Sequence, residues 1–455
     1  MRVHFIAIGG AVMHNLAIAL HLKGYTVTGS DDEIFEPSRS RLSLYGLLPE
    51  QKGWFPEKIT DDIDIVILGM HARADNPELL KASASGIRIM SFPEFLYEQT
   101  KNKTRIVVAG SHGKTTTTAM IMHVMKLSDV KFDYMVGSSI TGYETMVSLT
   151  DEAEFAILEG DEYLTSPIDR RPKFHLYKPD IAVLNGIAWD HMNVFPTFEN
   201  YVEQFRIFAG LIEPGGSLVY FADDQEVRKI AEEVRDDIRK IPYRVHAHFQ
   251  NRKGFYAATI NRTVPVRIFG EHNMQNMSAA REACLAAGIT EDQFYDAIRS
   301  FEGTSGRLQK LDENPRGIFY YDFAHAPSKV KATVEAVSTR YPGRNIIACF
   351  ELHTFSSLSS SFLPFYKDTL RKATRAYVYF NPHQFELKKL APLSENDVKE
   401  AFGGDNVEVF NNSAAMLTAI KRANPDKPVY LFMSSGDFDG CDLRSLSKEL
   451  LGIAV

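Results

Sequence analysis

Short apolar runs alternate with amphipathic stretches along the first hundred residues of the chain. Each apolar run has the length of a strand, and the first stretch between two runs has helical character and ends at Gly24. Strands that alternate with helices are typical of a parallel, doubly wound sheet. The strands expected in this part cover residues 3–8, 26–31, 64–70 and part of 87–96.

The alternation continues after a polar run at residues 98–104, which we interpret as a linker. A length of 455 residues predicts about three domains. Further strands are expected at 105–110, 154–160, 180–187, 216–222, 317–324, 345–352, 375–380 and 428–436, with a helix at 269–289. We therefore predict an α/β protein of three domains, each with a mainly parallel sheet, at residues 1–101, 102–303 and 304–455.

Charge and cysteine usage narrow the classes of function. The net charge of −7 gives no general attraction to nucleic acid or anionic lipid, so a phosphate site must be local. The cysteines at 284, 349 and 441 form no C-x-x-C pair, which argues against disulfides and zinc and fits a reducing cytoplasm. No uninterrupted apolar run of 18 residues or more predicts a membrane span.

The clearest chemical signal is the sequence AGSHGKTT at 109–116, between an expected strand and an expected helix. It lacks the first glycine of the G-x-x-x-x-G-K-[ST] motif, because Val108 stands at that position. The backbone N–H groups and the helix N-terminus would still surround phosphate oxygens, Lys114 would reach the β- and γ-phosphates of a nucleotide, and Thr115 would bind Mg²⁺. The nucleotide-binding residues expected here are Gly110, Ser111, His112, Gly113, Lys114, Thr115 and Thr116.

Two further segments carry candidate chemistry. LEGDEY at 158–163 ends an expected strand in acids, and a carboxylate at that place beside the phosphate loop is well placed to hold Mg²⁺, although a solvated acidic turn is commoner. Gly9 and Gly10 follow the first strand without completing G-x-G-x-x-G, so an NAD oxidoreductase is poorly supported. The loop still offers backbone N–H groups to a diphosphate.

The loop form G-[ST]-H-G-K-T-T-T resembles that of the Mur ligases, the ATP-dependent amide-forming enzymes of peptidoglycan synthesis. Four later segments resemble motifs of the same family: NGIAWDHMN at 185–193, GEHNMQN at 270–276, GRLQ at 306–309 and DFAHAP at 322–327. The resemblance covers almost the whole chain. It implies a Rossmann-like first domain that binds a UDP-sugar, a P-loop ATPase-like central domain, and a Rossmann-like third domain that binds the incoming amine and part of ATP.

The resemblance also implies residue roles. The metal ligands would be Thr115, Glu159 and His191, and the catalytic residues would be Lys114, Glu159, His191, Arg307 and His325. Asn273, Arg307 and Asp322 would complete the ATP site. The UDP-sugar site would consist of Gly9, Gly10, Ala11, Met13, Ser30, Asp31 and His71. Some relatives have a carbamylated lysine about fifteen residues after the DH pair, where this chain has Arg206, which cannot be carbamylated.

Within the family, the segment at 169–174 is similar to that of the murein-recycling branch. This implies a cytoplasmic ligase that joins the carboxylate of UDP-N-acetylmuramate to the amine of L-Ala-γ-D-Glu-meso-diaminopimelate through an acyl phosphate, with ATP and Mg²⁺. A UDP-N-acetylmuramate–L-alanine ligase or another Mur-type ligase stays open, because Thr354 stands where an arginine is expected. A non-catalytic P-loop nucleotide-binding module is the alternative from another class.

Overall fold

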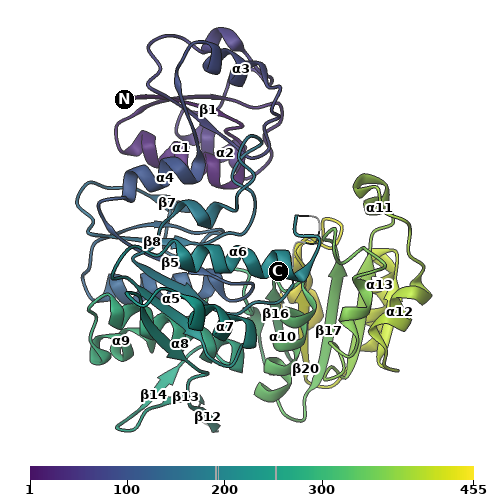
Figure 1. Ribbon diagram of the computed structural model, residues 1–455. Helices are drawn as coiled ribbons and strands as arrows, with labels where there is room; N and C mark the ends of the chain where they lie inside the picture. The colour runs from purple at the N-terminus through teal and green to yellow at the C-terminus, as the bar shows by residue number, and fades with distance from the viewer. Residues whose placement is uncertain (190–191, 193, 252–253, 455) are drawn as a thin grey trace. The chain divides into compact units, whose positions relative to one another are not determined.

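The computed structural model describes residues 1–189, 192, 194–251 and 254–454. These residues form an α/β structure with three large sheets that are mainly parallel, which confirms the predicted fold class (Figure 1). The chain separates into two compact units. The first unit contains Met1–Ile187, Phe198–Arg244 and Met277–Ile298, and the second contains Ala188–Thr197, Val245–Asn276 and the chain from Arg299 onward. The three domain boundaries expected from the sequence stay a prediction.

The N-terminal sheet of the first unit has four parallel strands in the order β2-β1-β3-β4. Val3 of β1 lies opposite the half-buried Val27 and the buried Ile65, so apolar residues of three strands are in register there. The strands are β1 (Arg2–Ile6), β2 (Thr26–Ser30), β3 (Ile65–Leu68) and β4 (Arg88–Ser91). The helices are α1 (Ala11–Leu22), α2 (Ser38–Leu44), η1 (Pro56–Lys58), α3 (Pro77–Ala84) and α4 (Phe92–Thr100).

The second sheet of the first unit has seven strands in the order β11-β10-β9-β5-β8-β6-β7, and only β7 is antiparallel to its neighbour among them. Its strands are β5 (Thr104–Ala109), β6 (Phe132–Met135), β7 (Val147–Ser148), β8 (Phe155–Glu159), β9 (Ile181–Leu184), β10 (Ser217–Phe221) and β11 (Arg239–Tyr243). Its helices are α5 (Lys114–Leu127), η2 (Lys173–Leu176), α6 (Phe198–Gly210), α7 (Gln225–Glu233) and α9 (Glu291–Ile298).

Hydrogen bonds tie the N-terminal sheet to this second sheet. The buried Asn15 side chain on α1 accepts a hydrogen bond from Met146 N at 2.9 Å, just before β7. Arg41 donates to the Glu144 carbonyl at 2.6 Å, and Lys23 forms an ion pair with Asp151. The two sheets therefore belong to one compact unit.

The second unit contains a small antiparallel sheet, β12-β13-β14, and a six-stranded sheet, β15-β16-β20-β17-β18-β19, in which only β15 runs antiparallel to its neighbour. The strands are β12 (His248–Asn251), β13 (Gly254–Ala258), β14 (Thr263–Val266), β15 (Gln309–Glu313), β16 (Ile318–Asp322), β17 (Asn345–Leu352), β18 (Arg375–Phe380), β19 (Val407–Phe410) and β20 (Pro428–Met433). The helices are α10 (Pro327–Arg340), η3 (Leu363–Tyr366), α11 (His383–Lys388), α12 (Glu395–Phe402), α13 (Ser413–Ala423) and α14 (Leu443–Leu451). The division between the units falls inside α8 (Glu271–Ala286).

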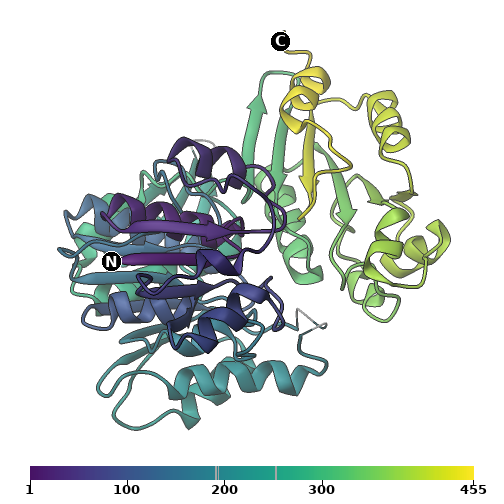
Figure 2. The same cartoon turned by 90° about the horizontal axis from the view of Figure 1, so that it is seen from above.

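Strand order in the seven-stranded sheet decides which side chains can meet. β5 lies between β9 and β8 and is parallel to both. Val108 is in register with Glu159, and Ala109 is in register with Leu184. The segments that follow these three strands consequently leave the sheet at one edge, which is where ligands bind in open parallel sheets. Figure 2 shows the chain from above. Among the residues that the structure describes, no helix has the length and apolarity needed to span a bilayer.

Candidate functional site

The phosphate loop leaves β5 and returns directly into α5, which begins at Lys114. Gly110 has a φ of +122°, and a Cβ there would lie 2.9 Å from Asn185 N, so no side chain fits. Ser111 N donates to the Gly186 carbonyl at 2.8 Å, which fixes the loop to the end of β9. The missing first glycine of the longer motif therefore does not prevent a closed loop at the N-terminus of a helix, where backbone N–H groups favour an anion.

Lys114 is held between the loop and an acid. Its Nζ donates to the Gly110 carbonyl at 2.8 Å and lies 2.7 Å from Glu162 Oε2. The side chain of Lys114 is 14% exposed and that of Glu162 is 1% exposed. Burial alone would lower the pKa of the ammonium group, but the adjacent carboxylates, with Glu162 foremost, raise this pKa above its ordinary value. Lys114 is thus positively charged at neutral pH.

Thr115 and Glu159 meet at the start of α5. Thr115 Oγ1 donates to Glu159 Oε1 at 2.8 Å, and Gly137 N donates to Glu159 Oε2 at 2.8 Å. A hydroxyl and a carboxylate are hard oxygen ligands, and Mg²⁺ is usually bound by one or two carboxylates together with substrate phosphates and water. The pair therefore fits Mg²⁺ beside a bound triphosphate. No cluster of three or more His, Cys, Asp or Glu side chains suited to a metal occurs in the described ranges.

Glu162 is a site residue that the sequence analysis did not select. Besides Lys114, it accepts a hydrogen bond from the Tyr201 hydroxyl at 3.3 Å, and that hydroxyl lies 2.9 Å from Ser111 Oγ. Tyr201 is fully buried. The local signal was the second acid of Glu159-x-x-Glu162, but neither helix nor strand periodicity shows which acid reaches the loop lysine.

The predicted UDP-sugar residues gather at the ends of β1 and β2. Gly9 N donates to Asp31 Oδ2 at 2.7 Å, and a Cβ on Gly9 would lie 2.9 Å from this oxygen. Burial raises the pKa of Asp31 to about 6, partly offset by backbone hydrogen bonds from Gly9 and Glu33. Ser30 Oγ accepts from Lys58 at 3.3 Å. Gly10, Ala11 and Met13 follow at the start of α1, and His71 lies exposed after β3.

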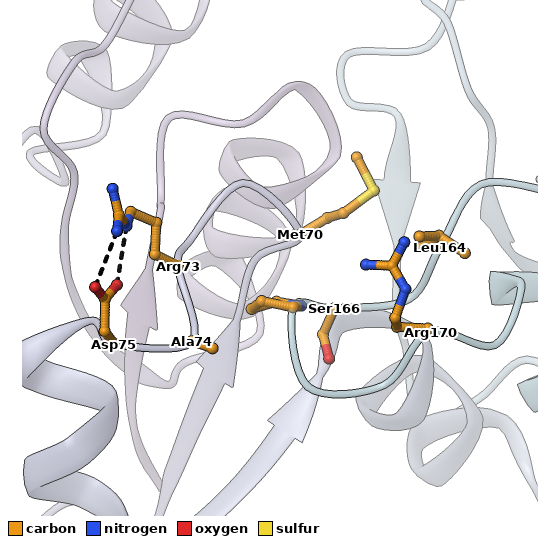
Figure 3. A pocket seen from close by; sticks show the side chains of 8 residues that line it. Met70, Arg73, Ala74, Asp75, Leu164, Ser166 and Arg170 are labelled. Carbon is orange, nitrogen blue, oxygen red and sulfur yellow. Dashed lines mark hydrogen bonds and ion pairs between the residues drawn. The ribbon is translucent and has the colours of Figure 1, made fainter. Parts of the chain in front are cut away.

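A cavity of about 460 Å³ is lined on one side by sequence neighbours of His71 (Figure 3). The segment after β3 forms one wall, and the segment after Glu162 forms the other. Figure 3 shows the Arg73 guanidinium turned toward the Asp75 carboxylate, with two hydrogen bonds of 2.9 and 3.0 Å, and Arg170 extending from the opposite wall. The lining residues are Met70, Arg73, Ala74, Asp75, Leu164, Ser166, Pro167 and Arg170.

The second unit carries the remaining predicted residues. Asp322 ends β16 and accepts hydrogen bonds from Leu308 N at 2.5 Å and Ala324 N at 2.6 Å. Burial raises the pKa of Asp322, and the Arg307 charge opposes that shift. The Arg307 guanidinium lies 4.6 Å from the Phe323 ring centroid. The structure therefore brings the predicted residues 307 and 322 into one group.

Two more predicted residues of this unit have local partners. His325 Nδ1 lies 2.9 Å from the Phe323 carbonyl, so in the neutral ring Nδ1 is the donor and Nε2 is the acceptor nitrogen. Asn273 on α8 is buried and donates to the Phe269 carbonyl at 2.9 Å.

The predicted residues are divided between the two units. Those of the N-terminal loop, the phosphate loop and Glu159 lie in the first unit, whereas Asn273, Arg307, Asp322 and His325 lie in the second. His191 falls outside the described residues. Arg206 on α6 is paired with Glu203 and Glu233. Thr354, which stands where the resemblance implies an arginine, accepts a hydrogen bond from Ser357 N at 3.1 Å.

The chain is similar to known proteins over its whole length. It matches the Mur ligase family, catalytic domain at residues 2–46, the Mur ligase middle domain at 108–284, and the Mur ligase, glutamate ligase domain at 306–436. It is 30% identical to a UDP-N-acetylmuramate–L-alanine ligase of Pelodictyon phaeoclathratiforme, with 100% of this chain and 96% of the relative covered.

Solved structures with the same fold include two ligases. A murein peptide ligase of Psychrobacter arcticus has a TM-score of 0.67 and 21% identity, covering 100% of this chain and 99% of the other. A UDP-N-acetylmuramate–alanine ligase of Thermotoga maritima has a TM-score of 0.71 and 19% identity, covering 99% and 98%.

Proposed function

This chain belongs to the Mur ligase family, and from that premise we propose that it joins UDP-N-acetylmuramate to L-Ala-γ-D-Glu-meso-diaminopimelate. As a family member it is an ATP-dependent, ADP-forming ligase that makes a C–N bond. The observation that carries the reaction type is the phosphate loop with Lys114 and Thr115 beside Glu159 at one edge of the sheet. The choice of acceptor rests on the segment at 169–174, because the fold is shared with both a murein peptide ligase and an alanine ligase.

In this proposal, the donor carboxylate attacks the γ-phosphate of ATP and ADP leaves. The acceptor amine then attacks the resulting acyl phosphate, phosphate departs, and an amide remains. Backbone N–H groups of the loop at 110–114 bind the triphosphate, except that of Ser111, which donates to the Gly186 carbonyl. The Lys114 ammonium group turns partly from Glu162 toward the β- and γ-phosphates and balances their charge. Thr115 and Glu159 hold Mg²⁺, which when bound neutralises charge on the phosphate oxygens.

The second unit contributes Arg307 and His325 to the proposal. Arg307 adds positive charge to the phosphoryl group during transfer. His325 accepts a proton from the attacking amine through Nε2, because its Nδ1 is engaged with the Phe323 carbonyl. Asp322 and Asn273 would contact the ribose and adenine of ATP.

A UDP-N-acetylmuramate–L-alanine ligase is the second candidate, because relatives at 30–31% identity carry that name. Phosphate release with ATP, Mg²⁺ and UDP-N-acetylmuramate separates the two. We expect the tripeptide to support release far better than L-alanine, and UDP-N-acetylglucosamine, which has no lactyl carboxylate, to support none. A preference for L-alanine would select the second candidate. Release that needs no UDP-sugar would contradict the proposed reaction.

A further inference from the structure

The chain reverses direction after Glu162 and returns to the acidic segment that follows β8. Thr165 N donates to the Arg171 carbonyl and Lys173 N donates to the Tyr163 carbonyl, both at 2.9 Å. Phe174 N approaches the Asp161 carbonyl at 3.3 Å. We name residues 161–174 the return loop. It brings Lys173 back to the acids that follow β8.

Lys173 places an ammonium group beside these acids. Its Nζ donates to Asp161 Oδ2 at 2.6 Å, and its side chain is 15% exposed. An ammonium group has three N–H donors. Within the described part of the chain, Asp161 is the one partner of the Lys173 ammonium, so two donors remain for a ligand. Low exposure strengthens the attraction of such a group for an anion.

The return loop also forms a wall of the cavity in Figure 3. Leu164, Ser166, Pro167 and Arg170 line it from this side, opposite Met70–Asp75. The return loop therefore carries both the cavity wall and the ammonium group, and Leu164 and Lys173 are nine residues apart in it. The segment that would contact a ligand in the cavity therefore also carries a cation that could bind an acidic substituent of this ligand.

The negative charge of the acids that follow β8 indicates a role for the Lys173 ammonium group. Glu159, Asp161 and Glu162 provide three carboxylates within four positions, and they repel an incoming carboxylate. Lys114 is committed to Glu162 and, in the proposed reaction, to the triphosphate. Lys173 is the second lysine ammonium ion-paired with these three acids among the described residues. The Lys173 ammonium group consequently favours a substrate carboxylate that must reach the γ-phosphate more than it favours a neutral group.

We propose that Lys173 is the residue that receives the lactyl carboxylate of the UDP-sugar donor. Asp161 orients the ammonium group, and the return loop carries the group from the cavity wall to the phosphate side. This inference rests on the proposed function, since it assigns a role toward the same donor. It concerns substrate binding before any phosphate is transferred.

Calorimetric titration without ATP tests the role directly. Lys173→Met should weaken binding of UDP-N-acetylmuramate by about tenfold or more, the usual effect of losing a charge-assisted hydrogen bond. It should change binding of UDP-N-acetylglucosamine less than about twofold, because that nucleotide has no carboxylate. Lys173→Arg should restore part of the affinity for the acidic donor. Equal weakening for both nucleotides, or none for either, would overturn the proposal.

Two variants separate charge from loop structure. Asp161→Asn breaks the same ion pair but leaves the ammonium group and removes an acid, so it should bind UDP-N-acetylmuramate at least as tightly as the wild type does. If it matched the defect of Lys173→Met, the ion pair would only hold the loop. Arg171→Met is the matched control, because Arg171 pairs with Asp169 at the exposed tip. It should leave both affinities unchanged.

Wild-type measurements distinguish this inference from the proposed function. If the wild type forms amide and Lys173→Met binds the acidic donor normally, the inference alone is wrong. If the wild type binds neither nucleotide, the donor assignment is wrong and the inference falls with it. Thermal unfolding of each variant establishes that the protein is folded before affinities are compared.

Discussion

Removal of the Lys114 charge should lower the free energy of unfolding and should also abolish phosphate release, and these two effects can be separated. Lys114→Met would leave the Glu162 carboxylate, 1% exposed, without its cation at 2.7 Å. At an effective dielectric constant of about 20, two unit charges at this distance attract by about 6 kcal/mol. Desolvation of both groups offsets part of this attraction, so we expect the free energy of unfolding to fall by about 3 kcal/mol.

A second variant isolates the catalytic part. Lys114→Met combined with Glu162→Gln removes the unpaired buried charge, so the free energy of unfolding should return to within about 1 kcal/mol of the wild type. Phosphate release should stay absent, because the triphosphate has lost its lysine. Glu162→Gln alone serves as the control for replacing the Glu162 carboxylate by a side-chain amide.

Urea unfolding followed by fluorescence, together with phosphate release, measures both effects on the same samples. An unchanged unfolding midpoint for Lys114→Met would refute the energetic argument. Phosphate release by the double variant would refute the assignment of Lys114 to the triphosphate.

Two further predictions concern Asp31 and Gly110. Because the folded pKa of Asp31 is raised to about 6, this group contributes stability that is present below about pH 4 and is lost as pH rises through 6. In Asp31→Asn the free energy of unfolding should not show this loss of up to about 3 kcal/mol. Parallel curves of unfolding free energy against pH for the variant and the wild type would contradict this prediction. Gly110→Ala should weaken ATP binding at least about tenfold in a fluorescent-nucleotide titration, because its Cβ would meet Asn185. Gly215→Ala, with a φ of +75° but open space, is its control, and equal ATP affinity of Gly110→Ala and wild type would contradict the steric argument.

Buried parallel strands were the most predictable part of the fold. Residues 181–184 are all buried, and such a strand is a continuous apolar run that the sequence displays directly. The sheet β12-β13-β14 was not predicted. Its strands are four or five residues long, and β12 is exposed throughout, so no apolar run announces it. The antiparallel strand β15 was missed for a related reason, since its residues are half-buried or exposed.

The site was predictable where a short segment alone determines the geometry. The phosphate loop needs only a strand, two glycines and a helix N-terminus, all of which lie within residues 104–127. The ion pair of Lys114 with Glu162 joins residues 48 positions apart, in the segments that follow the neighbouring strands β5 and β8. The ion pair of Lys173 with Asp161 depends on a reversal of the chain that periodicity cannot reveal.

The Asn15–Met146 hydrogen bond limits how this enzyme can be dissected. A fragment that ends after α4 would expose the side of α1 that carries the buried Asn15 and would leave its amide oxygen without the Met146 donor. Swapping in the N-terminal sheet of another ligase would require its α1 to match the chain just before β7. Hybrid ligases should therefore tolerate junctions that keep residues 1–187 from one parent better than junctions near residue 101.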